Sequence, residues 1–357
     1  MKTAIVGLPM TGKTSLFTIL TGVHESTRMG STEARIGMTK VPDPRLDALA
    51  KIYDPPKVTS ATVEFLDFPS ISKEALRDPS YLASLRVADA IAHVVRVFED
   101  DTVPHEKATV GPLRDIEDVD VELILSDLAV VEKRLERLEK DRKKAHGAEL
   151  EQEFDLLSEA KEKLENNESL RGWELSKEAD KLMRGFQFLS QKPMLIVLNL
   201  GEADAPRLAE VEAEYAAKLL AGKSNTGVTA ICGKIEAELA ELSAEERAEY
   251  MSSYGLPGSS LNRMITAAYH LLGLMSFLTA GDDECRAWTI PIGSNAVKAA
   301  GAIHSDFEKK FIRAEAVNWK ILVDNGGYSG LREKGQLRVE GKDYIVQDGD
   351  VLEIRHG

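Results

Sequence analysis

Eight residues near the start of the chain have the spacing of a loop that binds phosphate groups. They read Gly7-Leu8-Pro9-Met10-Thr11-Gly12-Lys13-Thr14 and match the pattern G-x-x-x-x-G-K-[ST]. In such a loop, backbone N–H groups and the positive end of the following helix surround the phosphates. The lysine contacts the β- and γ-phosphates, and the hydroxyl of the last residue binds Mg²⁺. The predicted nucleotide-binding residues here are Gly7, Pro9, Met10, Thr11, Gly12, Lys13, Thr14 and Ser15.

The neighbouring sequence agrees with a phosphate loop and supplies a second metal ligand. An apolar run, residues 2–6, precedes the loop, and a segment with helical spacing follows it. Asp67 ends another apolar run. A carboxylate at the tip of a neighbouring strand could hold Mg²⁺ through water. We therefore expect Thr14 and Asp67 to bind Mg²⁺, the alternative for Asp67 being a residue that caps the next turn.

Candidate base-binding residues follow two later apolar runs. GTPases commonly carry Asn-Lys-x-Asp at the first place, where the aspartate accepts hydrogen bonds from guanine. This chain lacks that lysine and aspartate, whereas an asparagine can bond N6 and N7 of adenine. We expect ATP, with GTP as the alternative, and a strand-end turn is the structural alternative for Asn199. The predicted base-site residues are Asn199, Leu200, Glu202, Cys232, Gly233 and Lys234.

Apolar runs alternate with helical segments through most of the chain, which predicts an α/β fold with a parallel sheet. Between residues 121 and 168, apolar residues recur every three or four positions, so two long helices form a hairpin with a basic tip. The last 80 or so residues read as a small α+β module. We expect residues 1–120 and 191–276 to form the nucleotide-binding domain, 121–190 a helical insertion and 277–357 a C-terminal domain.

Composition limits the classes of function. The 357 residues include 45 Lys and Arg against 59 Asp and Glu, a net charge of −14, which argues against indiscriminate nucleic-acid binding. Cys232 and Cys285 are too few for a disulfide framework and indicate reduced thiols. The start lacks the features of a signal peptide, and the longest apolar stretch, 265–280, is too short to span a bilayer. We expect a cytoplasmic protein with no membrane role.

The chain resembles the YchF/Obg-like ATPase family, a branch of the TRAFAC-class P-loop GTPases, over essentially its whole length. The matching segments are GLPMTGKTSLF (7–17), VPDPRLDALA (41–50), ADAIAHVVRVFEDD (88–101), NLGE (199–202), GKIEAEL (233–239), SLNRMITAAYHLLGL (260–274), RAWTIPIGSNAVKAAGAIHSDFEKKFIRAE (286–315) and EGKDYIVQDGDVLE (340–353). The resemblance implies a P-loop NTPase fold with a Ras-like G domain, an inserted α-helical coiled-coil hairpin and a C-terminal TGS-like β-grasp domain.

The resemblance also implies an activity. The family prefers ATP to GTP, hydrolyses it slowly and associates with ribosomes, and its N-x-x-E motif matches Asn199 and Glu202. A histidine linked to hydrolysis in the family matches His105, which would orient or activate water. Lys13 and His105 are therefore the expected catalytic residues. The alternative for His105 is a loop histidine with no role in hydrolysis.

The chain departs from the family where the γ-phosphate is sensed. The family's D-I-A-G-L is replaced by a segment with Pro69 and Ser70 after Asp67, and the glycine-rich loop after it is shortened. In the first switch, Ser31 or Thr32 is a candidate Mg²⁺ contact, and Met10-Thr11 stand where Asn-Val is usual. We expect the β-phosphate to bind as in the family, whereas the coupling of hydrolysis to switch movement is altered.

Three functions are consistent with these residues. The first is a slow ATPase that acts as a switch on the ribosome. The second is a nucleotide-binding scaffold with little hydrolysis, and the third is a GTP-binding protein. Two basic groups, Arg142, Lys143 and Lys144 at the hairpin tip and Lys309, Lys310 and Arg313 in the tail, are candidate contacts to ribosomal RNA, the alternative being solvated charges. We expect no sequence-specific DNA partner.

Overall fold

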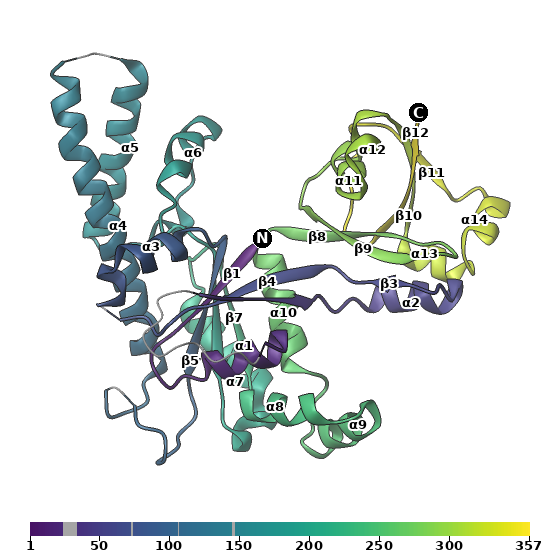
Figure 1. Ribbon diagram of the computed structural model, residues 1–357, viewed down its shortest axis with the longest axis horizontal. Helices are drawn as coiled ribbons and strands as arrows, with labels where there is room; N and C mark the ends of the chain where they lie inside the picture. The colour runs from purple at the N-terminus through teal and green to yellow at the C-terminus, as the bar shows by residue number, and fades with distance from the viewer. Residues whose placement is uncertain (24–33, 73, 106, 145–146) are drawn as a thin grey trace. The chain divides into compact units, whose positions relative to one another are not determined.

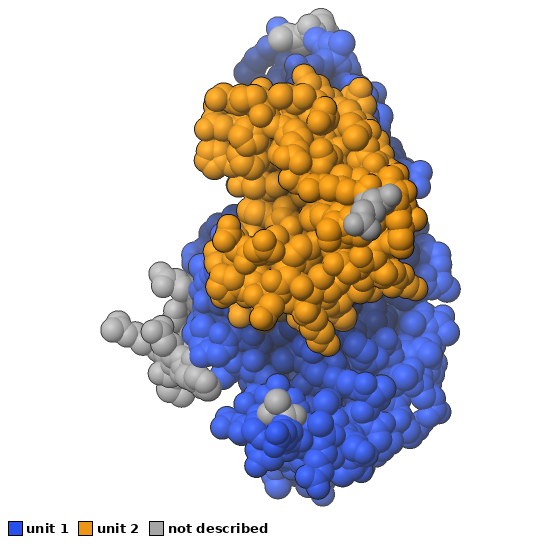
Figure 2. All heavy atoms as spheres, turned by 90° about the vertical axis from the view of Figure 1, so that its right-hand side faces the viewer, with its two compact units in different colours: residues 1–38, 64–271 blue, residues 39–63, 272–357 orange. Residues whose placement is uncertain are grey.

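The computed structural model describes residues 1–23, 34–72, 74–105, 107–144 and 147–357 (Figure 1). Contacts divide the chain into two compact units (Figure 2). The first comprises residues 1–38 and 64–271, and the second comprises 39–63 and 272–357. The helical insertion belongs to the first unit. Residues 39–63, which we expected in the nucleotide-binding domain, pack instead with the C-terminal part of the chain.

A six-stranded sheet, in the order β2-β4-β1-β5-β6-β7, carries the phosphate loop. Its strands are β1 (Lys2–Val6), β2 (Arg35–Lys40), β4 (Thr62–Asp67), β5 (Ala90–Arg96), β6 (Met194–Asn199) and β7 (Thr226–Ile231). The pairs β1–β4, β1–β5, β5–β6 and β6–β7 are parallel. Every residue of β5 and β6 is buried, as is typical of a parallel sheet covered on both faces. The predicted α/β architecture is confirmed.

Helices connect these strands. They are α1 (Lys13–Thr21), η1 (Ala75–Arg77), α3 (Pro79–Arg86), η2 (Leu170–Gly172), α6 (Lys177–Met183), η3 (Arg184–Phe186), η4 (Glu202–Arg207), α7 (Leu208–Leu219), α8 (Gly233–Glu241), α9 (Ala244–Ser253) and α10 (Ser260–Leu271). Local capping sets several boundaries. Asp78 accepts the N–H of Ser80 before α3, and Ser243 forms a capping box with Glu246 before α9. In the described part of the chain, no helix has the length and apolar character needed to cross a membrane.

The helical hairpin consists of α4 (Pro112–Arg142) and α5 (Ala148–Glu165). Val131 and Leu138 of α4 share a buried apolar cluster with Leu157 and Leu164 of α5, which explains the predicted spacing of three and four. α4 begins well before the expected start of the insertion, and Ile116 and Val119 of its first turns belong to the core of the sheet. The hairpin is therefore continuous with the nucleotide-binding unit.

The second unit contains a mixed sheet in the order β11-β10-β12-β8-β9-β3. Its strands are β3 (Val58–Thr59), β8 (Leu274–Thr279), β9 (Cys285–Pro291), β10 (Phe311–Asn318), β11 (Arg338–Glu340) and β12 (Asp350–His356). Its helices are α2 (Pro44–Tyr53), α11 (Ala296–Ile303), α12 (Ser305–Lys309), α13 (Trp319–Asp324) and α14 (Tyr328–Lys334).

Three contacts explain why residues 39–63 belong to this second unit. β3 pairs in parallel with β9. Arg45 forms an ion pair of 2.8 Å with Asp348. The hydroxyl oxygen of Tyr53 accepts a hydrogen bond of 3.1 Å from the N–H of Tyr328. All three join residues more than 200 positions apart, so no local pattern predicts them.

One buried histidine in the sheet links the stability of the fold to pH. His93 lies in β5 between Val6 of β1 and Ile196 of β6, and it is 1 % exposed. Burial lowers the pKa of His93 from its ordinary value of 6.5 to about 4. The unfolded chain therefore binds an extra proton between these two pH values. Stability falls as the pH is lowered through this window.

We predict that His93→Leu makes the fold less sensitive to acid. Between pH 7 and pH 5, the wild type should lose about 2 kcal/mol more free energy of unfolding than the variant, because only the wild type must keep an imidazole neutral. Urea unfolding at the two pH values measures the difference. An equal loss in both proteins would contradict the buried, neutral state of His93.

Candidate functional site

The phosphate loop joins β1 to α1 at the edge of the sheet where the parallel strands end. Met10 and Gly12 have φ values of 61° and 89°, in the left-handed region. At Gly12 this conformation favours glycine, and a Cβ there would lie only 2.6 Å from the side-chain nitrogen of Asn199. A Cβ at Gly7 would lie 2.5 Å from the carbonyl oxygen of Val94. Close packing therefore requires glycine at both positions, and the backbone conformation requires it at Gly12 as well.

Lys13 is buried, although it is the cation expected to meet the phosphates. Its ammonium group donates to the hydroxyl of Ser70 at 2.6 Å and to the carbonyl of Leu8 at 3.4 Å. Burial lowers the pKa of Lys13, and the carboxylate of Asp67 opposes this effect. The side chain is thus held next to the loop by groups on two different segments.

Thr14 and Asp67, the predicted metal ligands, lie together. The Thr14 hydroxyl donates to Oδ2 of Asp67 at 3.3 Å. Arg35, on β2, donates to the same carboxylate through Nε at 3.2 Å and through a second nitrogen. The other carboxylate oxygen, Oδ1, is buried and has no hydrogen-bond partner among the described residues.

This arrangement fits a magnesium ion. Mg²⁺ takes oxygen ligands in an octahedron, in which neighbouring ligands are about 3 Å apart. The Thr14 hydroxyl and the Asp67 carboxylate have that spacing, and the unpartnered oxygen of Asp67 supplies an acceptor that the protein leaves unused. Arg35 limits the negative charge of the pair, so a contact through water is favoured over direct ligation by Asp67. Ser31 and Thr32, the candidates from the first switch, lie outside the described residues.

Asn199 connects the phosphate loop to the second predicted loop. Its side-chain nitrogen donates to the carbonyl of Thr11 at 3.0 Å, and its side-chain oxygen accepts from the N–H of Gly233 at 3.0 Å. The nitrogen and the oxygen of the side-chain amide are therefore each hydrogen-bonded to a backbone group. The nitrogen keeps a second hydrogen and the oxygen a second lone pair for a base.

The other predicted base-site residues differ in exposure. The side chains of Leu200 and Cys232 are buried in apolar clusters, so only their backbone faces the loops. Glu202 and Lys234 are ion-paired across the two loops, and the Lys234 side chain is 67 % exposed. In the phosphate loop, Pro9, Met10 and Ser15 are exposed, whereas the Thr11 hydroxyl is buried and donates to the carbonyl of Leu8.

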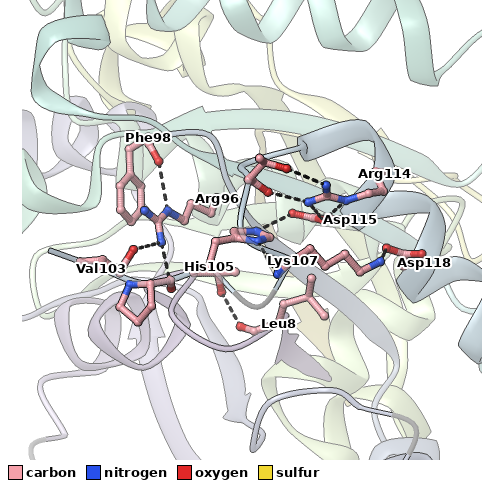
Figure 3. A network of polar contacts seen from close by, with 12 residues as sticks. Leu8, Arg96, Phe98, Val103, His105, Lys107, Arg114, Asp115 and Asp118 are labelled. Carbon is pink, nitrogen blue, oxygen red and sulfur yellow. Dashed lines mark hydrogen bonds and ion pairs between the residues drawn. The ribbon is translucent and has the colours of Figure 1, made fainter. Parts of the chain in front are cut away.

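His105 lies in a polar network at the base of the hairpin (Figure 3). Its Nδ1 accepts from the N–H of Lys107 at 3.1 Å, so Nε2 carries the proton and donates to Asp115 of α4 at 3.0 Å. Arg114 donates to the other oxygen of Asp115. Both ring nitrogens are thus engaged, and the imidazole is held against the first turn of α4.

Arg96 fixes the loop that carries this histidine. It is 2 % exposed and donates to the carbonyls of Phe98, Asp100, Val103 and Pro104 (Figure 3). Sequence reasoning missed this residue, as it missed Arg35, because the signal for each is a single arginine at the end of a strand. Their partners become visible only when the chain is folded.

The two basic groups proposed for RNA contact are exposed in different ways. Lys143 and Lys144 have exposed side chains at the hairpin tip, whereas Arg142 pairs with Glu151 of α5 and lies over the ring of Phe154. Lys309, Lys310 and Arg313 are exposed on the second unit. Ala145 and His146, between the hairpin helices, lie outside the described residues.

Known proteins match almost the whole length of the chain. Residues 2–133 match the family model described as a 50S ribosome-binding GTPase. Residues 274–357 match the model of the YchF GTPase C-terminal domain, described as a protein of unknown function. The Ribosome-binding ATPase YchF of Bacillus subtilis (strain 168) is 40% identical over 358 residues, covering 98% of each chain. The protein of the same name from Escherichia coli O157:H7 is 40% identical over 363 residues, again covering 98% of each.

A solved structure agrees with these sequence matches. The YchF GTPase of Schizosaccharomyces pombe superimposes with a TM-score of 0.83 at 26% identity, covering 99% of this chain and 97% of that one. The nucleotide-binding unit and the C-terminal unit both fall within these matches. The chain therefore belongs to the YchF family.

Proposed function

We propose that this chain binds ATP with Mg²⁺ at the phosphate loop, hydrolyses it slowly and acts as a switch on the cytoplasmic ribosome. The observation that carries the proposal is the buried ammonium group of Lys13, placed beside the Thr14–Asp67 pair at the start of α1. The full-length relatives named Ribosome-binding ATPase YchF support the activity and the partner.

Positioning and electrostatics account for the chemistry. The backbone N–H groups of the loop and the positive end of α1 bind the phosphates, and Lys13 neutralises charge on them. Thr14 and Asp67 would hold Mg²⁺, which would supply further positive charge for the phosphates. Water attacks the phosphorus of the terminal phosphate, and the bond from that phosphorus to the bridging oxygen breaks. ADP and inorganic phosphate form without a covalent enzyme intermediate. In support of this proposal, Lys13 bonds to Ser70, Thr14 bonds to Asp67 and Arg35 bonds to Asp67.

His105 is the proposed residue for orienting the attacking water. In the structure its ring donates to Asp115, so this role requires the loop around it to leave α4. Leu8 of the phosphate loop and Lys107 line one cavity, which places the histidine loop next to the nucleotide-binding loop.

Adenine is the proposed base. The exposed ion pair between Lys234 and Glu202 occupies the loops where a guanine-specific site needs a free carboxylate. Because Glu202 is paired, it is a weaker acceptor for the two N–H groups of guanine. The spare donor and acceptor of Asn199 suit adenine, which presents one acceptor and one donor on its N6–N7 edge.

A scaffold with little hydrolysis remains the second candidate, and a specific contact favours it. The N–H of Ile71 donates to the carbonyl of Gly7 at 3.0 Å, so the segment after Asp67 is bonded to the phosphate loop itself. A segment held in this way is less free to move with the γ-phosphate. Single-turnover hydrolysis separates the two functions, since only the ATPase converts bound ATP to ADP.

We predict that Lys13→Ala lowers single-turnover ATP hydrolysis by at least about 100-fold, because the variant lacks the positive charge at the transferred phosphate. Rapid mixing of excess protein with labelled ATP and Mg²⁺ measures the rate. Lys133→Ala, which removes an exposed lysine on α4, is the matched control and should leave the rate unchanged. Hydrolysis equal in the wild type and Lys13→Ala would contradict this mechanism.

We predict that the protein binds ATP at least tenfold more tightly than GTP, a difference of about 1.4 kcal/mol. The reason is the lack of a free carboxylate for guanine. Titration calorimetry with ATP and GTP, each with Mg²⁺, measures both affinities. GTP binding ten times tighter than ATP would overturn the proposed base preference.

We predict that the double variant Lys143→Glu/Lys144→Glu co-sediments with ribosomes less than the wild type does, and that raising the salt concentration weakens wild-type binding. Both effects follow from contact between the hairpin tip and RNA phosphates. Lys177→Glu/Lys181→Glu on α6 makes the same charge change at exposed positions and serves as the control. Equal co-sedimentation of both double variants and the wild type would show that Lys143 and Lys144 do not contribute to ribosome binding.

A further inference from the structure

The four residues that follow β4 are anchored on both sides of Ser70. Phe68 and Ile71 are 1 % and 2 % exposed, and both belong to the core of the sheet. Their backbone N–H groups donate to the carbonyls of Ile5 and Gly7 at 3.2 and 3.0 Å. The segment therefore continues the contact between β4 and β1 up to the phosphate loop.

Pro69 is held as well. The hydroxyl of Tyr81, on α3, donates to the carbonyl of Pro69 at 3.2 Å, and the Tyr81 ring packs edge-on against Phe68 with centroids 5.6 Å apart. The proline ring itself restricts the backbone. Ser70 thus occupies a position set by its neighbours on each side and by a helix behind them.

The hydroxyl of Ser70 is directed at the phosphate-binding lysine. Its oxygen accepts from the ammonium group of Lys13 at 2.6 Å. A serine hydroxyl that accepts one hydrogen bond keeps a hydrogen to donate. Among the described residues, no acceptor for that hydrogen is found. An uncommitted O–H donor therefore lies one hydrogen bond away from the cation that contacts the β- and γ-phosphates.

We propose that Ser70 distinguishes nucleoside triphosphates from diphosphates by donating its hydroxyl hydrogen to the terminal phosphate while its oxygen holds Lys13. The inference rests on the proposed function, namely that the loop binds a purine nucleotide. A diphosphate has no third phosphate to accept the bond, so Ser70 adds nothing to its binding. The serine thus supplies a side-chain donor at a place where a glycine would offer backbone alone.

The hydrogen bond between Ser70 and Lys13 is also compatible with the opposite effect, in which Ser70 weakens nucleotide binding. The experiment must distinguish the two effects. If the phosphates had to displace Ser70 from Lys13, the hydroxyl would compete with the nucleotide and its removal would strengthen binding. The anchored backbone favours a bond that persists, because an ammonium group has three donors and can hold both a hydroxyl and phosphate oxygens.

The test is titration calorimetry of the full chain with Mg²⁺ and two probes, ADP and a non-hydrolysable ATP analogue. Ser70→Ala should bind the analogue about tenfold more weakly than the wild type, a change of about 1.4 kcal/mol, and ADP within about twofold. Ser70→Thr keeps the hydroxyl and should retain the affinity for the analogue. Ser72→Ala removes a hydroxyl in the same segment that accepts the N–H of Ala75 and should leave the ratio of the two affinities unchanged.

Unchanged ADP binding in Ser70→Ala also reports that the variant is folded. Tighter binding of the analogue by Ser70→Ala, or an equal change for both nucleotides, would overturn the inference and leave the proposed function intact. Equal weakening in Ser70→Thr and Ser70→Ala would likewise contradict a role for the hydroxyl. If the wild type bound neither of the two probes and neither of the matching guanine nucleotides, the proposed function and this inference would both be overturned.

Discussion

The nucleotide site depends on the side-chain amide of Asn199. It bonds the carbonyl of Thr11 and the N–H of Gly233, and so joins two loops that are far apart in the sequence. Asn199 is 8 % exposed, so the loss of either bond leaves a buried polar group unpaired, at a cost of about 1–3 kcal/mol. The parallel sheet makes the contact possible, because the carboxyl ends of β1 and β6 meet at the same edge.

Near Asn199, the site combines buried charges of both signs. Lys13 and Asp67 are each less than a tenth exposed, and Arg35 bonds the carboxylate from β2. Removing one of these side chains leaves the remaining buried charge unpaired. The fold then loses more free energy of unfolding than the intact ion pair contributes. The charges proposed to contact the phosphates are consequently part of the packed structure.

A second network links the site to the hairpin. Arg96 holds the loop that ends in His105, and His105 bonds Asp115 in the first turn of α4. Because α4 continues from this turn to the basic tip, one helix contacts both the histidine loop and the proposed RNA-binding end. A partner that binds the hairpin tip therefore binds the same helix that contacts His105. This connection matters because the relatives of this chain are named as ribosome-binding ATPases.

The amino-acid sequence alone determined the features that depend on short-range spacing. Three features depend only on residues that are close together in the sequence: the phosphate loop, the strand that ends at Asp67 and the periodicity of the hairpin. Over such short distances, glycine conformation and apolar spacing restrict the backbone. The segment from Asp67 to Ser70 was recognisable as a departure from the family for the same reason. The family resemblance supplied the order of domains.

Only the tertiary structure decided which distant groups meet. The bonds from Arg35 to Asp67, from Lys13 to Ser70 and from His105 to Asp115, and the pairing of β3 with β9, each depend on strand order or loop path. No residue in these pairs carries a local signal for its partner, since a single polar side chain fits many environments. The physical reason is that spacing restricts nearby backbone, whereas contact between distant side chains follows from the packing of the whole sheet.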